Sequence, residues 1–204
     1  MSTFTYRVAT PDDGPGITEA YMSAFAKSYI TIRCFPRSSP ATHAGWAQSL
    51  AGYFTNPDTT IIVATDDTTT PPTVVGFAKW SAPQREDSRA EHEYFPSYPP
   101  EGDVELATEF FDGIARKRKE IMGERKYWHL HMLAVRPDYQ GRGAAGPLIK
   151  WGAERADEDG LPCYLDASPM AKAIYERYGF KVADTLVFGG GELVETMMVR
   201  EAAS

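Results

Sequence analysis

The sequence predicts one α/β domain, built on a mixed β-sheet with helices packed against it. Three observations lead to this fold class. The chain has 204 residues, the usual size of one domain. Apolar segments of strand length alternate with longer segments of helical periodicity, and two strand-like segments are separated only by a short polar turn. A hairpin makes antiparallel neighbours and helical crossovers allow parallel ones, so the sheet should contain both.

The N-terminal part contains three expected strands and two expected helices. Thr10 and Pro11 stop the first strand, Pro36 and Pro40 separate the two helices, and the polar turn 66–72 joins the other two strands as a hairpin. The expected elements are, in order, a strand over 4–9, helices over 17–29 and 40–53, and strands over 60–64 and 74–80.

A long loop over about 81–102 follows and carries four prolines. Loops of this length in compact domains are usually functional or disordered. Ser168 and Gly179 are the start and stop signals of the last expected helix. With no repeat and no linker, we expect a single domain over 1–204. After the loop the pattern predicts helices over 104–122, 143–158 and 168–178, and strands over 127–135, 162–165, 180–187 and 192–199.

Composition and charge exclude several classes of function. The formal net charge is −7 and no basic face is visible, so we expect no nucleic-acid partner. No apolar run approaches the ~18 residues of a membrane helix, so we expect no membrane partner. Cys34 and Cys163 are the two cysteines, which is typical of a reducing compartment and predicts a cytoplasmic location. His43 and His92 lack neighbours at metal-ligand spacing, so we expect no metal.

A glycine-rich loop, Gln140-Gly141-Arg142-Gly143-Ala144-Ala145-Gly146, joins the most strand-like segment to a helix. Small residues in succession let a backbone approach a ligand closely, and exposed N–H groups at a helix start attract anions. The loop therefore suits a phosphate-bearing ligand. Its three glycines also match the dinucleotide fingerprint, but they lie away from the strand end and too little chain follows for a doubly wound sheet. A tight turn without a ligand is the other alternative.

The segment Val135-Arg136-Pro137-Asp138-Tyr139-Gln140-Gly141-Arg142-Gly143-Ala144-Ala145 resembles the acetyl-CoA motif of the GNAT N-acetyltransferase superfamily. A second signature of that family follows over 173–180, Ala-Ile-Tyr-Glu-Arg-Tyr-Gly-Phe, and the order of expected elements also matches. The resemblance implies a GNAT-like fold with a central mixed, mostly antiparallel twisted sheet flanked by helices. It also implies an N-acetyltransferase, that is, an acyltransferase with acetyl-CoA as co-substrate.

The strand segment His129-Leu130-His131-Met132-Leu133-Ala134-Val135 resembles a strand of serotonin (arylalkylamine) N-acetyltransferases, in which two histidines at this spacing lead into the acetyl-CoA loop. Residues two apart on a strand face the same side. A histidine with an ordinary pKa near ~6.5 can accept a proton at neutral pH and pass it on. His129 and His131 are therefore candidate catalytic residues, with ordinary hydrogen-bonded sheet histidines as the alternative.

Tyr175 matches the general acid of the family, which protonates the CoA sulfur; a core tyrosine is the alternative. By the same resemblance, the strand backbone should pair with the pantetheine arm and the loop amides should hold the pyrophosphate. Ser168 lies where the family often has an asparagine, so it is expected either to contact CoA or to cap its helix. The implied cofactor-binding residues are Leu133, Ala134, Val135, Gln140, Gly141, Arg142, Gly143, Ala144, Ala145, Gly146 and Ser168.

In this family the acceptor pocket is built by the first helices and by the connection that precedes the central strand. We expect direct transfer of an acetyl group, in a ternary complex, to a primary amine of a small molecule, with an arylalkylamine as the narrower hypothesis. A protein N-acetyltransferase is one alternative. A non-catalytic acyl-CoA-binding or sensor module is another, and it needs the glycine loop but neither Tyr175 nor the histidines. The aromatic candidates for the pocket are Phe25, Tyr29 and Phe35, with Tyr94, Phe95 and Tyr98 of the long loop.

Overall fold

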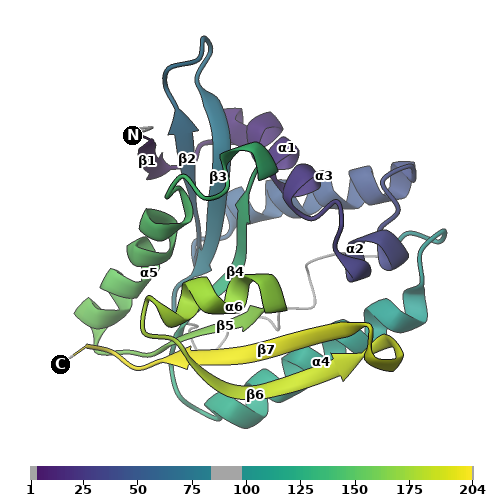
Figure 1. Ribbon diagram of the computed structural model, residues 1–204, viewed down its shortest axis with the longest axis vertical. Helices are drawn as coiled ribbons and strands as arrows, with labels where there is room; N and C mark the ends of the chain where they lie inside the picture. Colours follow the sequence, from purple (N-terminus) through teal and green to yellow (C-terminus); the bar gives the residue numbers. More distant parts are fainter. Residues whose placement is uncertain (1–3, 84–97, 204) are drawn as a thin grey trace.

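A computed structural model describes residues 4–83 and 98–203 (Figure 1). The order of elements within these residues is the predicted one, apart from one additional short helix, α2. The strands are β1 (Thr5–Val8), β2 (Thr59–Asp66), β3 (Thr73–Ser81), β4 (Trp128–Val135), β5 (Cys163–Ala167), β6 (Lys181–Phe188) and β7 (Leu193–Arg200). The α-helices are α1 (Gly14–Ala24), α2 (Tyr29–Cys34), α3 (Pro40–Thr55), α4 (Val104–Met122), α5 (Ala145–Asp159) and α6 (Pro169–Glu176).

The strands of the described residues form one sheet in the order β1-β2-β3-β4-β5-β7-β6. Neighbouring strands are antiparallel except for β4 and β5, which run parallel, so the expected mixed and mostly antiparallel sheet is confirmed. The parallel pairing extends only from Trp128 opposite Cys163 to Leu130 opposite Leu165. Beyond it β4 and β5 separate, and in Figure 1 strands β2–β4 and strands β5–β7 run in clearly different directions.

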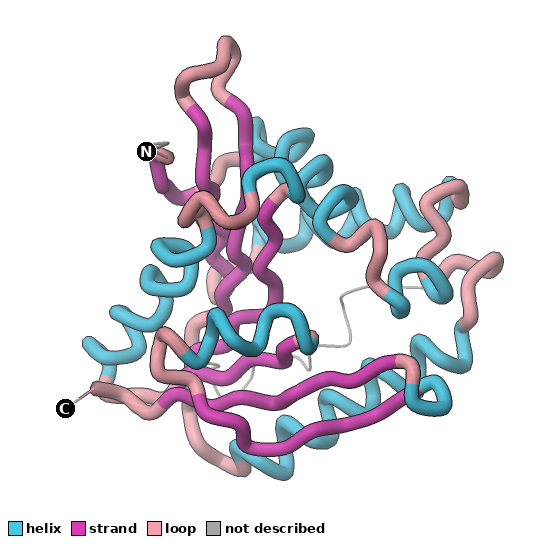
Figure 2. Tube along the Cα trace, viewed as in Figure 1, coloured by secondary structure: helices cyan, strands magenta, loops and turns pink. Residues whose placement is uncertain are grey.

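Helices cover both faces of the sheet (Figure 2). On one face, α5 and α6 contribute Leu148 and Tyr175 to a buried cluster that contains Trp80 of β3. On the other face, α1 and α3 pack Ile17 and Trp46 against β2–β4, while α4 lies against β6 and β7. Burial of each such side chain contributes about 1.5–3 kcal/mol, so both faces stabilise the sheet.

Local capping signals fix where the helices begin and end. The Ser39 hydroxyl accepts the backbone N–H groups of Ala41 and Thr42 at the start of α3, and Asp103 accepts that of Leu106 at the start of α4. Gly160 adopts the left-handed conformation (φ +65°) that ends α5. Helix α4 therefore has the predicted bounds. Among the described helices, none combines the length and the apolar composition of a membrane span.

A β-bulge interrupts the pairing of β3 with β4. Lys79 lies opposite Met132 and Trp80 lies opposite Leu130, which leaves His131 as the extra residue on β4. The bulge directs His131 and Met132 toward the same face of the sheet, which is the face covered by α1 and α3. It comes directly after the last residue of β4 that pairs with β5, so it marks the point where the two strands separate.

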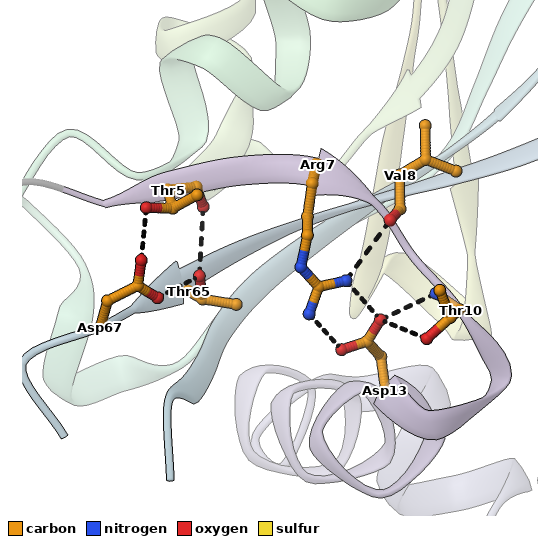
Figure 3. Close-up of polar contacts among 7 residues, drawn as sticks. All are labelled: Thr5, Arg7, Val8, Thr10, Asp13, Thr65 and Asp67. Carbon is orange, nitrogen blue, oxygen red and sulfur yellow. Dashed lines mark hydrogen bonds and ion pairs between the residues drawn. The ribbon is translucent and has the colours of Figure 1, made fainter. Parts of the chain in front are cut away.

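Polar contacts anchor the short first strand (Figure 3). Both guanidinium N–H groups of Arg7 donate to the carboxylate of Asp13, each at 2.7 Å. The hydroxyls of Thr5 and Thr65 donate to the Asp67 carboxylate, which ties β1 to the end of β2. The Arg7 contact lowers the pKa of Asp13, because the cation favours the ionised carboxyl group.

The helix expected over 17–29 is divided into α1 and α2, so the prediction of one continuous helix was wrong. Phe25 packs with the cluster of α1 and α3, whereas Tyr29 packs with the cluster of α2 and α4. The chain turns between these clusters, and Ser28 takes an extended conformation (ψ 132°) before α2. The long loop begins after Ser81 as expected, but its residues 84–97 lie outside the described residues.

Candidate functional site

The candidate site begins at the open edge of β4. Beyond Leu130 this edge has no strand partner among the described residues. Arg136 donates its N–H to the Val75 carbonyl, so by the alternation of an antiparallel ladder Ala134 also directs its backbone groups toward β3. Leu133 and Val135 therefore direct theirs toward the open edge. An extended ligand can pair with these two residues, and of the three expected strand contacts Ala134 is the one turned away.

The glycine loop connects this edge to α5. Gly141 (φ +75°) and Gly143 (φ +89°) have left-handed backbones, and an added Cβ would meet open space at both. A Cβ on Gly146 would instead come within 2.3 Å of the Tyr178 hydroxyl oxygen, so this glycine allows helix packing. Ala144 is buried and Ala145 is the first residue of α5. The open side of the loop thus lies over 141–143, close to the helix start.

Neighbouring side chains give the loop a fixed shape and positive charge. The Gln140 side-chain amide donates to the Val135 carbonyl at 3.0 Å and closes the loop back on β4. The Arg142 guanidinium lies 4.9 Å from the centre of the Tyr139 ring. The Trp80 indole N–H of β3 donates to the Leu148 carbonyl in the first turns of α5 at 3.1 Å, which holds the helix start against the sheet. The backbone N–H groups and Arg142 together suit an anionic group such as a pyrophosphate.

His129 and His131 lie side by side, with ring centroids 3.6 Å apart. His129 is 4% exposed. Burial lowers the pKa of both rings, and the nearby charges of Lys79 and Arg118 lower it further. Both histidines are therefore neutral at pH 7 and are weaker bases than the ordinary histidine assumed from the sequence. A proton accepted by either ring is readily passed on.

Further ionisable groups lie on the same face of the sheet, and sequence reasoning missed them. The Lys79 ammonium lies 3.9 Å from the centre of the Tyr53 ring, and burial lowers its pKa. The Tyr164 hydroxyl donates to Asp166 at 2.7 Å, while burial raises the pKa of Asp166 to about 6. Burial and the charge of Asp166 raise the pKa of Glu195 to about 8. Lys79, Asp166 and Glu195 are charged residues inside mostly apolar strands, and this pattern is visible in the sequence.

Tyr175 lies on α6, on the opposite face of the sheet from the histidines. It is buried, its ring packs against Phe180, and burial raises the pKa of its hydroxyl, so it is a protonated phenol at neutral pH. Ser168 precedes α6 and its carbonyl accepts helix N–H groups, but its exposed side chain makes no capping hydrogen bond. The hydroxyl of Ser168 is thus available for a ligand contact.

The structure divides the expected aromatic pocket between two clusters. Phe25 packs near Trp46, whereas Phe35 (4% exposed) and Tyr29 pack with the residues of α4. Tyr98 stacks on Phe111 with ring centroids 6.0 Å apart. Tyr94 and Phe95 lie outside the described residues. Within the described ranges, no three side chains of metal-ligating type come together.

Comparisons with known proteins relate the C-terminal part of the chain to a described sequence family. Residues 111–200 match the sequence family described as an acetyltransferase (GNAT) domain. An uncharacterized N-acetyltransferase of Schizosaccharomyces pombe is 38% identical over 86 residues, which is 40% of this chain and 37% of that protein. The chain thus aligns with little more than a third of the length of this curated relative.

Solved structures are similar over almost the whole chain. A structure from Corynebacterium glutamicum, described as histone acetyltransferase HPA2 and related acetyltransferase, has a TM-score of 0.65 at 21% identity, covering 100% of this chain and 98% of that one. A mosquito arylalkylamine N-acetyltransferase-like protein, 5b, has a TM-score of 0.61 at 16% identity, covering 98% and 100%. At these identities the likeness establishes a shared fold.

Proposed function

The chain belongs to the GNAT superfamily, with its GNAT domain matched over residues 111–200, and from this premise we propose that it is an acetyl-CoA-dependent N-acetyltransferase. Its acceptor is the primary amine of a small molecule. One observation carries the proposal: β4 and β5 separate at His131, between a glycine loop suited to a pyrophosphate and the protonated phenol of Tyr175.

The residues at this opening fit acetyl-CoA. The backbone of Leu133 and the Val135 N–H pair with the amide groups of the pantetheine arm, as one strand pairs with another, since the Val135 carbonyl already accepts the Gln140 side chain. The amides around Gly141 and Gly143, with Arg142, bind the pyrophosphate. Acetyl-CoA supplies a thioester whose carbon accepts the amine. Because the loop is closed onto β4 by Gln140, the two binding elements keep a fixed spacing.

Side chains of the protein then accept the protons of the amine and supply a proton to the leaving sulfur. An alkylamine with a pKa of ~10.4 is mostly protonated at pH 7, and holding it neutral costs about 4.6 kcal/mol, so a proton acceptor in the site accelerates the reaction. The neutral pair His129 and His131 accepts protons and passes them toward solvent. Tyr175 donates its proton to the departing sulfur. Transfer is direct, in a complex that holds both substrates.

An arylalkylamine is the narrower acceptor that we propose. The His-Leu-His strand and the aromatic clusters near α1 and α2 support it, and a mosquito arylalkylamine N-acetyltransferase-like protein shares the fold. Phe25 directly follows α1, which packs on the face of the sheet that carries the histidines, and Tyr29 begins α2. These rings suit an aromatic amine better than a polyhydroxylated one.

The test is release of CoA thiol from acetyl-CoA with aryl alkylamines, polyamines, amino acids, aminoglycosides and lysine peptides. Release with a small amine, matched by an equal amount of N-acetylated product, is the expected result. Release with lysine peptides alone would replace the small-molecule acceptor with a protein. Intact binding of acetyl-CoA without release for any amine would favour an acyl-CoA-binding module.

A further inference from the structure

Glu195 lies at the same opening, on a different strand from the histidines. The pairing of β5 with β7 ends with Ala167 opposite Thr196, so Glu195 is the first residue of β7 beyond the end of β5. The charge of Asp166 on β5 raises the pKa of Glu195, and the charge of Glu195 in turn raises the pKa of Tyr175 on α6. Glu195 is therefore close both to the proposed proton donor and to the point where the sheet opens.

Glu195 is a buried carboxyl group without a protein partner in the described part of the chain. The residue is only 9% exposed. Among residues 4–83 and 98–203, none donates a hydrogen bond to its carboxylate or forms an ion pair with it. Ionising a carboxyl group in this position costs free energy, because the carboxylate loses most of its hydration without gaining a counter-charge. A cationic ligand group is the partner that its chemistry calls for.

We propose that Glu195 binds the ammonium group of the acceptor and takes its first proton. The acceptor is accordingly a primary amine with no carboxylate on the adjacent carbon. Asp166 reinforces this selection, since a second negative charge beside Glu195 attracts a cation and repels an amino-acid carboxylate. The inference deepens the proposed acetyl transfer and rests on it.

The protons balance as follows. Glu195 accepts one proton from the ammonium and leaves a neutral amine with a free electron pair. As the C–N bond forms and the C–S bond breaks, Tyr175 gives its proton to sulfur. The second amine proton returns to the Tyr175 phenolate, directly or through the histidines. Glu195 then loses its proton to solvent, so each turnover releases one proton beyond those exchanged within the site.

Competition between protons and amine for Glu195 gives a measurable signature. Its pKa is raised to about 8 by burial and by Asp166, so at pH 7 a proton occupies the carboxylate that the ammonium needs. On its own face of the sheet, Asp166 of β5 lies beside it, Leu186 of β6 lies opposite it, and Arg118 of α4 acts on Asp166. Its charge reaches Tyr175 of α6 from the other face. The KM for the amine should therefore fall as pH rises from 6 toward about 8.

The experiment compares tryptamine with tryptophan, which differ by one carboxylate, and the wild-type chain with Glu195→Gln. The wild type should acetylate tryptamine at least about tenfold more efficiently than tryptophan, as one misplaced buried charge costs that much or more. Glu195→Gln should raise the tryptamine KM about tenfold or more and lose the fall of KM with pH, while the exposed Glu192→Gln keeps both. Glu195→Asp should recover part of the pH dependence.

Each outcome decides the inference. Equal use of tryptamine and tryptophan, or an unchanged KM and pH profile in Glu195→Gln, overturns the role of Glu195 while acetyl transfer itself stands. If no amine is acetylated, calorimetry of tryptamine binding to the acetyl-CoA complex separates the two claims. Binding that depends on Glu195 then supports the cation site and contradicts the proposed transfer. Absence of binding contradicts both. The tryptophan comparison needs no variant, so it holds even where Glu195→Gln fails to fold.

Discussion

Replacing Tyr175 with phenylalanine should separate catalysis from stability. The ring is buried against Phe180 and stays in place in the variant, so no cavity forms. None of the described residues hydrogen-bonds to the hydroxyl, which is held protonated by burial. Removing a buried hydroxyl without a partner costs no stability and can add up to about 1 kcal/mol.

The expected loss of activity is much larger. A general acid accelerates proton transfer roughly 10²–10⁴-fold, which corresponds to about 2.7–5.5 kcal/mol of transition-state stabilisation. In Tyr175→Phe, kcat should fall by that factor while the affinity for acetyl-CoA stays the same. The melting temperature should stay within about 4 °C of the wild type. The assays are thiol release under saturating substrates, calorimetry and thermal unfolding.

Tyr178→Phe is the matched control, because it removes the same atom at the end of the same helix, beside Gly146. Its kcat should be close to that of the wild type. The reasoning is refuted if Tyr175→Phe lowers kcat less than about tenfold. It is equally refuted if the variant loses stability in parallel with activity, since Tyr175 would then act through packing.

Three further predictions follow from the structure. Gly143→Ala should weaken acetyl-CoA binding, because the left-handed backbone (φ +89°) costs a non-glycine residue about 1–2 kcal/mol; titration calorimetry measures it, and unchanged affinity would remove the loop from the binding site. The acid limb of the wild-type kcat profile, measured at saturating amine, should lie below pH ~6.5, since burial lowers the pKa of His129 and His131. That limb should be lost in the double alanine variant, and an unchanged profile would exclude both rings from proton transfer. Asp13→Asn should lower the free energy of unfolding by about 0.5–2 kcal/mol at pH 7, because it removes the charged acceptor of the two Arg7 hydrogen bonds. Because the pKa of Asp13 is depressed in the folded chain, this difference should shrink as pH falls below ~3.9; a constant difference down to pH 2 would contradict it.

Most elements could be predicted because their signals are local. The Asp103 cap and the amphipathic pattern of 104–122 define α4 without any knowledge of its surroundings. The hairpin of β2 and β3 follows from two apolar runs around a polar turn. The division of 17–29 into α1 and α2 could not be predicted, because it depends on which distant cluster each aromatic residue joins. Phe25 and Tyr29 look equivalent in the sequence, and only packing distinguishes them.

The candidate site could be proposed from the sequence where it depends on a continuous motif. The glycine loop and its basic residue can be recognised from adjacent residues, and their geometry suits an anion. The bulge at His131 is a property of the pairing between β3 and β4, so the pattern of β4 alone does not reveal it. Glu195 was missed for the same reason: it is one polar residue in a terminal strand until the end of β5 places it at the opening. The lowered pKa of the histidines likewise comes from neighbours on other strands and helices.

The most direct measurement is mass spectrometry of the acceptor after incubation of the full chain with acetyl-CoA that carries a deuterated acetyl group. Tryptamine and the other amines of the panel serve as acceptors, and boiled protein serves as the control. We expect one labelled acetyl group on a cationic primary amine, with one CoA thiol released for each amide formed. Bound acetyl-CoA whose label stays on the thioester, or is lost only to water as acetate, would contradict the account.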